Sequence, residues 1–391
     1  MANMPAPTTP YSLFIKPEGA KCNLDCYYCY YLKNADENSS AMTGSILEAV
    51  IKNHIISQPN NSPVIDFIWH GGEPMLKGLA FYQDAIQLQQ LQKKKQNITS
   101  PIKNTIQTNG TLINDRWAVF FAQHNFMVGI SVDGPHLIND IGRIDKSGNS
   151  SFERTMRGMR HLKEQNVEFN TLTVINNKSY KHGKKIYNFL KESGSTYLQF
   201  QPCIDHEMDR RFEYNWTLSG KQWGVFLCDV FDQWVANGVG KIYVQFFENC
   251  LMILMGSQSQ MCHHADTCGQ QLMMESNGDV FSCDQYGYDS YKIGNINKSD
   301  GSLAAMVSSE EQLKFGQDKY DSLSKKCLKC DFKLLCNGGC PKNRVKKTNL
   351  AEDHNVLCEG YEMFFKHALP IMLPMVKAMR QGHSPITHSL F

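Results

Sequence analysis

Three cysteines, Cys22, Cys26 and Cys29, stand near the start of this chain with the spacing C-x3-C-x2-C. They are one fewer than the four thiolates that usually hold a [4Fe–4S] cube, so one iron would stay open to another ligand. A structural zinc site is the alternative, but it would need a fourth ligand close by. The next histidine, His54, lies well outside this loop. The spacing therefore favours an iron–sulfur cluster with an open iron.

A second group of eight cysteines lies in the last third of the chain. Its members are Cys262, Cys268, Cys283, Cys327, Cys330, Cys336, Cys340 and Cys358. Eight thiolates can ligate two complete cubes, while C-x2-C pairs are also common in structural zinc modules. Spacing alone leaves both assignments open. Cys203, Cys228 and Cys250 stand apart, and we expect them to be buried small hydrophobes.

Polar residues follow several of the apolar runs. His70-Gly71-Gly72-Glu73 follows one such run, and two glycines there would permit close backbone approach. Ser131 ends another run and could donate a hydrogen bond to a ligand, and Arg143 beyond it could pair with a carboxylate. Taken singly, these residues could equally be a turn, a turn serine and a solvated arginine.

These residues need a scaffold, and the chain alternates apolar runs with helical patterns. We predict strands at Tyr11–Ile15, Val64–Trp69, Thr105–Thr108, Met127–Val132, Val167–Val174 and Tyr197–Phe200. We predict helices at Gly44–Ser57, Leu79–Lys95, Asp115–His124, Ser151–Gln165, Lys184–Ser193 and Lys221–Ala236. Such alternation indicates a parallel sheet wrapped by helices, with ligands bound at the carboxyl ends of the strands.

The remaining chain has fewer regular signals. A polar stretch from Asp205 to Gly220 suggests a connecting loop. Asn277-Gly278 predicts a hairpin turn within Met273–Ser282. A last amphipathic helix is expected over Gly360–Met379, followed by a frayed tail.

Composition and charge narrow the partners and the cellular compartment to be expected for this protein. The 391 residues carry a formal net charge of +2, which does not suggest a nucleic-acid partner. No apolar stretch is long enough to span a membrane, and no secretory signal is visible at the start. We therefore expect a cytoplasmic protein, in which clustered cysteines serve as metal ligands more often than as disulfides.

Taken in order, these motifs resemble the radical S-adenosylmethionine (SAM) enzymes and, among them, the anaerobic sulfatase-maturating enzyme family. The resemblance runs from Leu13 to about Phe365. It is carried by His70-Gly-Gly-Glu-Pro-Met-Leu76, Gln107-Thr-Asn-Gly-Thr-Leu112, Val128-Gly-Ile-Ser-Val-Asp-Gly-Pro135, Asn277-Gly-Asp-Val-Phe-Ser-Cys-Asp284 and Cys336-Asn-Gly-Gly-Cys-Pro-Lys342. One departure is His70, where many members carry glutamine, although histidine still offers a polar contact.

The resemblance implies that the open iron holds SAM and that its reductive cleavage yields a 5′-deoxyadenosyl radical. It also implies which residues contact SAM, namely Tyr28, Gly71, Gly72, Glu73, Ser131, Arg143 and Ile204. His70, Gln107 and Asn109 are candidates for holding the substrate.

The cysteine-rich end is similar to the SPASM domain, whose two auxiliary clusters take interleaved ligands. The resemblance implies a first auxiliary set of Cys262, Cys268, Cys283 and Cys340, and a second auxiliary set of Cys327, Cys330, Cys336 and Cys358. It also implies that Asp284, directly after Cys283, is the general base.

The implied fold is an α/β partial (β/α)6 TIM-type barrel of the radical SAM kind over residues 1–235. A SPASM domain with two auxiliary clusters over 236–358 follows, and then a C-terminal helix and tail over 359–391. The implied cofactors are SAM and three [4Fe–4S] clusters.

The implied activity is the oxygen-independent oxidation of a cysteine or serine to Cα-formylglycine in a sulfatase polypeptide bearing a C-x-P-x-R or S-x-P-x-R motif. A reductant such as flavodoxin or ferredoxin would supply the first electron, and the auxiliary clusters would carry the released one away. One alternative is another SPASM enzyme that forms thioethers or crosslinks in a ribosomal peptide. The short segment before the first strand counts against it. The other alternative is a metal-stabilised scaffold without activity.

Overall fold

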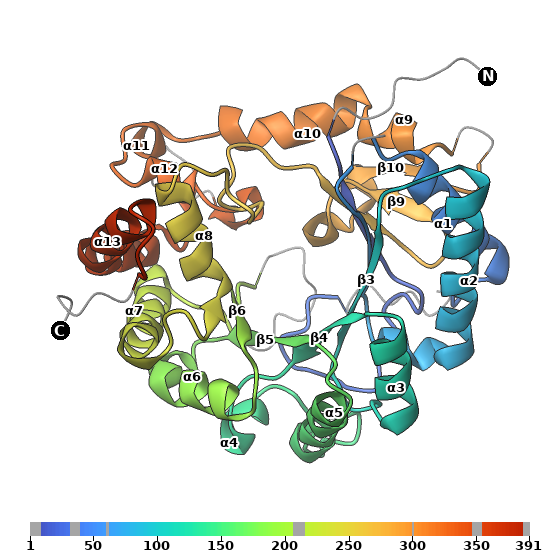
Figure 1. The fold of residues 1–391 in the computed structure, drawn as a ribbon. Helices are drawn as coiled ribbons and strands as arrows, with labels where there is room; N and C mark the ends of the chain where they lie inside the picture. The colour runs from blue at the N-terminus through green and yellow to red at the C-terminus, as the bar shows by residue number, and fades with distance from the viewer. Residues whose placement is uncertain are drawn as a thin grey trace. The chain divides into compact units, whose positions relative to one another are not determined.

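The computed structural model describes residues 9–31, 40–59, 62–205, 216–298, 301–345 and 354–385 (Figure 1). The chain forms two compact units, each built from separate stretches of sequence. Unit 1 comprises Met1–Ile130, Ile144–Glu168 and Gly269–Gln317, and unit 2 comprises Ser131–Arg143, Phe169–Cys268 and Asp318–Phe391. This division by contacts differs from the domain limits at residues 235 and 358, which stay predictions. Most of the loop predicted at Asp205–Gly220, and residues 386–391 of the predicted tail, lie outside the described residues.

A mainly parallel sheet forms the centre of unit 1. Its strands are β1 (Ser12–Ile15), β2 (Ile65–Trp69), β3 (Ile102–Thr108), β4 (Met127–Ser131), β8 (Gln271–Met274), β9 (Asp279–Phe281) and β10 (Lys292–Asn295). β1 pairs in parallel with β2 on one side and with β8 on the other, and β3 and β4 continue the parallel run beyond β2. β9 pairs antiparallel with β8 and with β10, which confirms the hairpin predicted at Asn277-Gly278.

Helices follow the parallel strands of unit 1 and lie along the outside of the sheet (Figure 1). They are α1 (Gly44–Ile56), α2 (Leu79–Lys95), α3 (Asp115–Gln123) and α5 (Phe152–Glu164), with α9 (Leu303–Val307) later in the chain. The predicted strands and helices agree with the observed ones to within three residues at each end. Large aromatic side chains fill the space beneath these helices, among them Trp69, Tyr82 and Phe121, all fully buried.

Asparagines end three of these helices in the same way. Asn97, Asn125 and Asn166 follow α2, α3 and α5, and each has a positive φ of 50–53°. A left-handed residue just after a helix lets the chain turn sharply towards the next strand, and asparagine tolerates this conformation better than most residues. The repeated use of asparagine thus ends each helix close to the start of the following strand.

Unit 2 contains three further parallel strands and a helical layer. The strands are β5 (Phe169–Ile175), β6 (Tyr197–Pro202) and the short β7 (Tyr243–Val244), and a small antiparallel pair joins β11 (Arg344–Val345) to β12 (His354–Asn355). The helices are α4 (His136–Asn139), α6 (Gly183–Glu192), α7 (Gly220–Asn237), α8 (Gln245–Leu254), α11 (Lys325–Leu328), α12 (Lys333–Cys336) and α13 (Cys358–Arg380). Strands β1 to β6 are each followed by a helix, so the predicted (β/α)6 series is confirmed.

Helix α10 (Glu310–Asp321) was not predicted. Charged and polar residues dominate its sequence, so its apolar periodicity is weak. Tertiary hydrogen bonds hold it in place, because Gln312 donates from Nε2 to the carbonyl oxygens of Gly269 (2.7 Å) and Ser282 (3.2 Å). In the described part of the chain, no helix has both the length and the apolar character needed to cross a membrane.

Helices α7 and α13 approach each other closely at glycines, which yields a stability prediction. A Cβ on Gly360 would lie 2.2 Å from the carbonyl oxygen of Gly220, whereas a Cβ on Gly44 at the start of α1 would meet nothing within 4 Å. We expect Gly360→Ala to lower the free energy of unfolding by about 1–3 kcal/mol, because the two backbones must move apart. Gly44→Ala is the control and should change it by less than about 0.5 kcal/mol. Equal denaturant midpoints for the two variants would contradict the close packing.

Candidate functional site

The loop that carries Cys22, Cys26 and Cys29 follows β1 in unit 1. Cys26 is buried, and the other two cysteines are half-buried. The N–H of Leu24 donates to Cys22 Sγ (3.4 Å), and the N–H of Asp25 donates to the carbonyl oxygen of Ile144 (2.9 Å). Leu24 also forms an isolated β-bridge with Asp145. The loop is therefore anchored by its own backbone, and its three sulfurs stay within one short segment.

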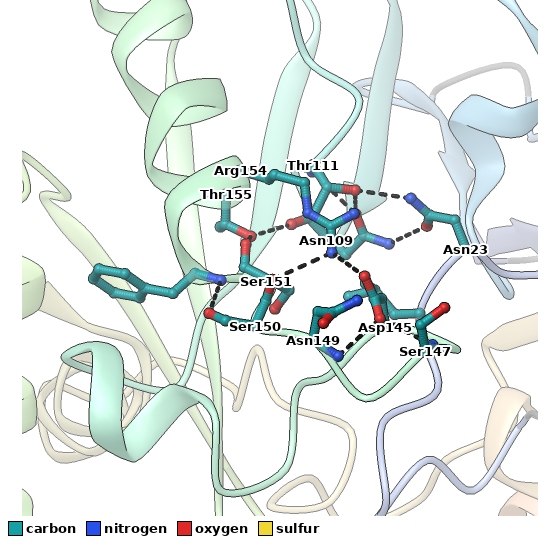
Figure 2. Close-up of polar contacts among 12 residues, drawn as sticks. Asn23, Asn109, Thr111, Asp145, Ser147, Asn149, Ser150, Ser151, Arg154 and Thr155 are labelled. Carbon is teal, nitrogen blue, oxygen red and sulfur yellow. Dashed lines mark hydrogen bonds and ion pairs between the residues drawn. The ribbon is translucent and has the colours of Figure 1, made fainter.

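Asn109 secures this loop from the end of β3 (Figure 2). Its Nδ2 donates to Asn23 Oδ1 (2.8 Å) and lies 3.8 Å from Cys22 Sγ, while its Oδ1 accepts from Thr111. Asn23 Nδ2 donates in turn to Thr111 Oγ1 (2.9 Å). The amide of Asn109 thus holds the cysteine loop, and the substrate contact expected for this residue stays a prediction.

A second set of contacts supports the same region from the start of α5 (Figure 2). The Asp145 carboxylate accepts from the backbone of Ser147 and Asn149 and pairs with Arg154 at 2.9 Å. Thr155 Oγ1 donates to the carbonyl oxygen of Asn109 (2.9 Å). These bonds fix the segment at Ile144 and Asp145, which Leu24 and Asp25 contact.

The glycine motif after β2 packs directly on the segment that leads into Cys22. The N–H of Gly72 donates to the carbonyl oxygen of Gly19 (2.9 Å). A Cβ on Gly72 would lie 2.1 Å from the carbonyl oxygen of Lys21, a distance that no side chain could occupy. The close approach that this glycine permits is thus an approach to the chain's own backbone. A contact of Gly71 and Gly72 with SAM stays a prediction.

Glu73 joins two strand ends from inside the protein. Its carboxylate is fully buried and accepts from the N–H of Met75 (3.0 Å), the N–H of Asn109 (2.9 Å) and the hydroxyl of Thr108 (2.8 Å). Burial raises the pKa of Glu73 to about 7, although these donors oppose the rise. The Glu73 carboxylate already accepts hydrogen bonds from protein groups. The SAM contact predicted for this residue would therefore be made by its backbone.

Asp284 follows β9 and sits among polar groups of unit 1. Its Oδ1 lies 2.9 Å from Lys16 Nζ and 4.0 Å from His70 Nδ1, and its Oδ2 accepts from the hydroxyl of Tyr30 (2.6 Å). Burial opposes ionisation of Asp284, but Lys16, His70 and Tyr30 outweigh it and hold its pKa below the ordinary value. The side chain is 13% exposed, although Oδ1 itself is buried. Asp284 is therefore an ionised, partly exposed acceptor.

Lys16 connects Asp284 to a second carboxylate. The Lys16 side chain is fully buried, and its Nζ lies 3.4 Å from the ring centroid of Tyr31. The Tyr31 hydroxyl donates to both oxygens of Glu275, at 2.6 and 2.7 Å. Burial raises the pKa of Glu275, and Lys16 opposes that rise. One ammonium thus serves both a carboxylate and an aromatic face.

Sequence reasoning missed the roles of Lys16, Tyr30 and Tyr31. Lys16 lies within the range of the resemblance, and the two tyrosines directly follow Cys29, but each could have been simple packing. The available signal was a lysine at the end of an apolar strand, since a buried lysine needs an anionic or aromatic partner. His70, predicted as a substrate contact, is brought beside Asp284.

Other predicted SAM contacts are spread over both units. In unit 2, Arg143 Nε lies 3.0 Å from Asp133 Oδ1, and both side chains are buried. The ion pair expected between Arg143 and SAM is therefore formed here with a protein carboxylate. Ser131 and Ile204 of unit 2 and Tyr28 of unit 1 are half-buried, and so is Gln107 of unit 1, which was predicted as a substrate contact.

Unit 2 gathers seven of the eight late cysteines into two groups. Cys262 and Cys268 both interact electrostatically with Cys340, and Cys336 does so with Cys327, Cys330 and Cys358. These groups match three members of the first auxiliary set and the whole second set. Cys283, the remaining member of the first set, belongs to unit 1. Burial raises the pKa of the Cys268 and Cys336 thiols to about 12, so a metal would have to displace their protons.

Two family models match this chain. The radical SAM superfamily matches residues 19–190, and the SPASM iron–sulfur cluster-binding domain matches residues 262–331. Cofactor chemistry based on SAM and iron–sulfur clusters follows from these two domains.

Full-length relatives are similar over nearly the whole chain. A serine-type anaerobic sulfatase-maturating enzyme of Bacteroides thetaiotaomicron is 40% identical over 96% of this chain and 94% of its own length. A cysteine-type enzyme of Clostridium perfringens is 33% identical over 93% of this chain and 98% of its own length. The solved structure of native anSMEcpe with bound AdoMet and Cp18Cys peptide has a TM-score of 0.84 at 33% identity, covering 94% of this chain and 99% of that one.

The anchoring role of Asn109 predicts a specific loss of iron. We expect Asn109→Ala to weaken the hold on the Cys22–Cys29 loop, because the bonds to Asn23 and Thr111 disappear together. Iron per chain after anaerobic reconstitution should fall from about twelve towards about eight, the content of two remaining cubes. The control is Asn53→Ala, since Asn53 bonds within helix α1 to the carbonyl oxygen of Ala49. Full iron content in Asn109→Ala would rule out the anchoring role.

Proposed function

This chain belongs to the anaerobic sulfatase-maturating enzyme family, and we propose on that premise that it oxidises a serine or cysteine of a sulfatase polypeptide to Cα-formylglycine without oxygen. The observation that carries the proposal is the ionised Asp284 carboxylate, held by Lys16 and Tyr30 directly after Cys283. A base in this position is what the reaction needs beside its radical chemistry.

The proposed oxidation removes a hydrogen atom, a proton and an electron from the substrate side chain. Cys22, Cys26 and Cys29 would hold a [4Fe–4S] cluster that, together with SAM, would supply the radical for removal of the hydrogen atom from Cβ, and the auxiliary clusters would take up the electron. The proton is left to the protein. From serine the product is the aldehyde, and from cysteine it is a thioaldehyde that water converts to the aldehyde with release of hydrogen sulfide.

Asp284 is the proposed acceptor of that proton. An ionised carboxylate offers about four acceptor positions, of which Lys16 and Tyr30 occupy one on each oxygen. The remaining positions can take the hydroxyl or thiol proton of the substrate. Lys16 and Tyr30 also fix the plane of the carboxylate, which keeps the acceptor aligned.

The surrounding residues have proposed roles in binding. His70, within 4.0 Å of Asp284, would contact the substrate residue, and Gln107 on β3 would hold the substrate backbone. Ser131, Arg143 and Ile204 of unit 2, together with Tyr28 and the Gly71–Gly72 backbone of unit 1, would contact SAM. We propose the first and second auxiliary sets as ligands of the two auxiliary cubes.

The partner is a sulfatase polypeptide with the C-x-P-x-R or S-x-P-x-R motif, and the higher identity to serine-type relatives supports serine as a substrate. A one-electron reductant such as flavodoxin or ferredoxin would start each turnover. We propose a cytoplasmic location, where free thiols and reduced clusters persist.

The test is incubation of the reduced, reconstituted enzyme with SAM and two peptides that differ only in C-x-P-x-R or S-x-P-x-R. Mass spectrometry should detect formylglycine in at least one peptide together with 5′-deoxyadenosine. A control peptide with alanine at the target position should stay unchanged. SAM cleavage that leaves both peptides unmodified would exclude this function and favour thioether or crosslink formation.

If Asp284 is the base, replacing it should uncouple SAM cleavage from aldehyde formation. Asp284→Asn keeps the size of the side chain but cannot accept the proton, so aldehyde formation should slow by roughly 10²–10⁴-fold. SAM cleavage should continue at a much higher rate than aldehyde formation. Asp289→Asn, an exposed aspartate five residues further on, is the matched control and should behave as wild type. An Asp284→Asn enzyme with the normal rate of aldehyde formation would remove the base.

The ion pair predicts non-additive effects of two substitutions. Lys16→Met removes the partner that orients Asp284, so it should slow aldehyde formation. The double variant Lys16→Met/Asp284→Asn should be no slower than Asp284→Asn, because Lys16 acts through the same carboxylate. The measurement is the aldehyde rate of all four enzymes at saturating peptide. A double variant slowed by the product of the two single effects would show that Lys16 acts independently.

A further inference from the structure

Lys319 is a fully buried lysine in the last turn of α10, and the function described above gives it no part. In the described part of the chain, no carboxylate appears among its partners. A buried cation without a counter-ion is costly, because it gives up its hydration without a compensating charge. The groups around Lys319 should therefore show what compensates its positive charge.

The Lys319 ammonium joins two cysteine-bearing loops of unit 2. It donates to the carbonyl oxygen of Ala265, which lies between Cys262 and Cys268 in sequence, and to that of Asn337 (3.3 Å), directly after Cys336. Asn337 Nδ2 joins the same two loops, since it donates to the carbonyl oxygen of His264 (2.8 Å). The ammonium is therefore fixed beside both loops.

Arg344 holds the lysine and its neighbours in this arrangement. Its guanidinium donates to the carbonyl oxygens of Lys319 (2.7 Å), Asn337 (3.2 Å) and Gly338 (3.2 Å). All these acceptors are backbone groups, so Arg344 adds a second positive charge near the loops and does not neutralise the first. The groups near Lys319 that would become anionic on binding metal are the thiols of the cysteine-bearing loops.

Burial, and after it Arg344, lower the pKa of Lys319, whereas the thiols of Cys268 and Cys262, from the first auxiliary set, and of Cys336, from the second, oppose that lowering and favour the charged ammonium. A cube with four thiolate ligands carries net negative charge, and reduction adds one more. A buried positive charge nearby therefore favours the reduced form, because net charge and local electrostatics set the reduction potential.

We propose that Lys319 is a positioning residue for electron transfer, whose buried charge raises the reduction potential of the auxiliary clusters on these loops. The part that this plays in turnover rests on the proposed function, since the auxiliary clusters would then accept the substrate's electron more readily. The charge itself acts on the clusters whether or not peptide is oxidised.

The alternative is that Lys319 is only a structural clasp, that is, a residue whose hydrogen bonds hold the two loops together without any effect of its charge. Three variants separate charge from clasp. Lys319→Gln keeps a hydrogen-bond donor but removes the charge, and Lys319→Arg keeps the charge. Asn337→Gly removes the second clasp at His264 and leaves Lys319 in place, and glycine accepts the left-handed backbone of Asn337 (φ 45°).

The experiment is an EPR-monitored redox titration of each reconstituted enzyme, with iron content and thermal unfolding measured in parallel. In Lys319→Gln the auxiliary signals should shift to more negative potential, while the cluster at Cys22, Cys26 and Cys29 keeps its potential. Lys319→Arg and Asn337→Gly should keep the wild-type potentials, although Asn337→Gly should unfold at lower temperature.

Several outcomes decide the proposal. Unchanged auxiliary potentials in Lys319→Gln would overturn it, and so would an equal shift in Asn337→Gly. If Lys319→Gln loses auxiliary iron, retention of iron and potential by Lys319→Arg supports a requirement for charge, whereas loss in both variants shows a structural clasp. A shift in potential with no formylglycine from any peptide would refute the proposed function and leave this inference standing.

Discussion

The pairing of β1 with β8 is the constraint on which the candidate site of unit 1 depends. It places residues 12–15 beside residues 271–274. Closing a loop of about 260 residues costs on the order of 5 kcal/mol beyond a constant, because the closure entropy grows only with the logarithm of length. The pairing buries Leu13, Ile15, Leu272, Met273 and Met274 completely. Each such side chain contributes about 1.5–3 kcal/mol, so burial outweighs the closure.

This pairing explains why Asp284 meets Lys16. β1 ends at Ile15, one residue before the lysine, and β9 is paired with β8, so the segment that carries Asp284 lies within reach of the Lys16 side chain. A buried lysine and a half-buried aspartate are each unfavourable alone, but together they satisfy one another. Lys16, with His70 and Tyr30, keeps Asp284 ionised although burial opposes it. A strand pairing set by apolar burial thereby produces a polar centre around an ionised carboxylate.

The loops that carry the cysteines are held by polar groups and not by apolar strand pairing. The Cys22–Cys29 loop is held by amide side chains and backbone bonds. The late cysteines of unit 2 lie on loops joined by Lys319, Asn337 and Arg344. In both places the polar groups that order the loops bond to backbone or amide atoms. The loops that carry the thiols are thus ordered largely by contacts between other groups.

The sequence by itself determined the local features of this protein. The apolar periodicity of Leu79–Lys95 placed α2 within its observed bounds, Asn277-Gly278 specified the hairpin, and C-x3-C-x2-C marked the cysteine loop. These features depend on residues close together in the chain. Only the tertiary structure decided that Lys16 and Tyr30 hold Asp284, that Asn109 anchors a loop, and that Lys319 lies between two cysteine groups. Each of these contacts joins residues far apart in sequence, and burial of distant apolar faces, to which no local pattern is sensitive, brings them together.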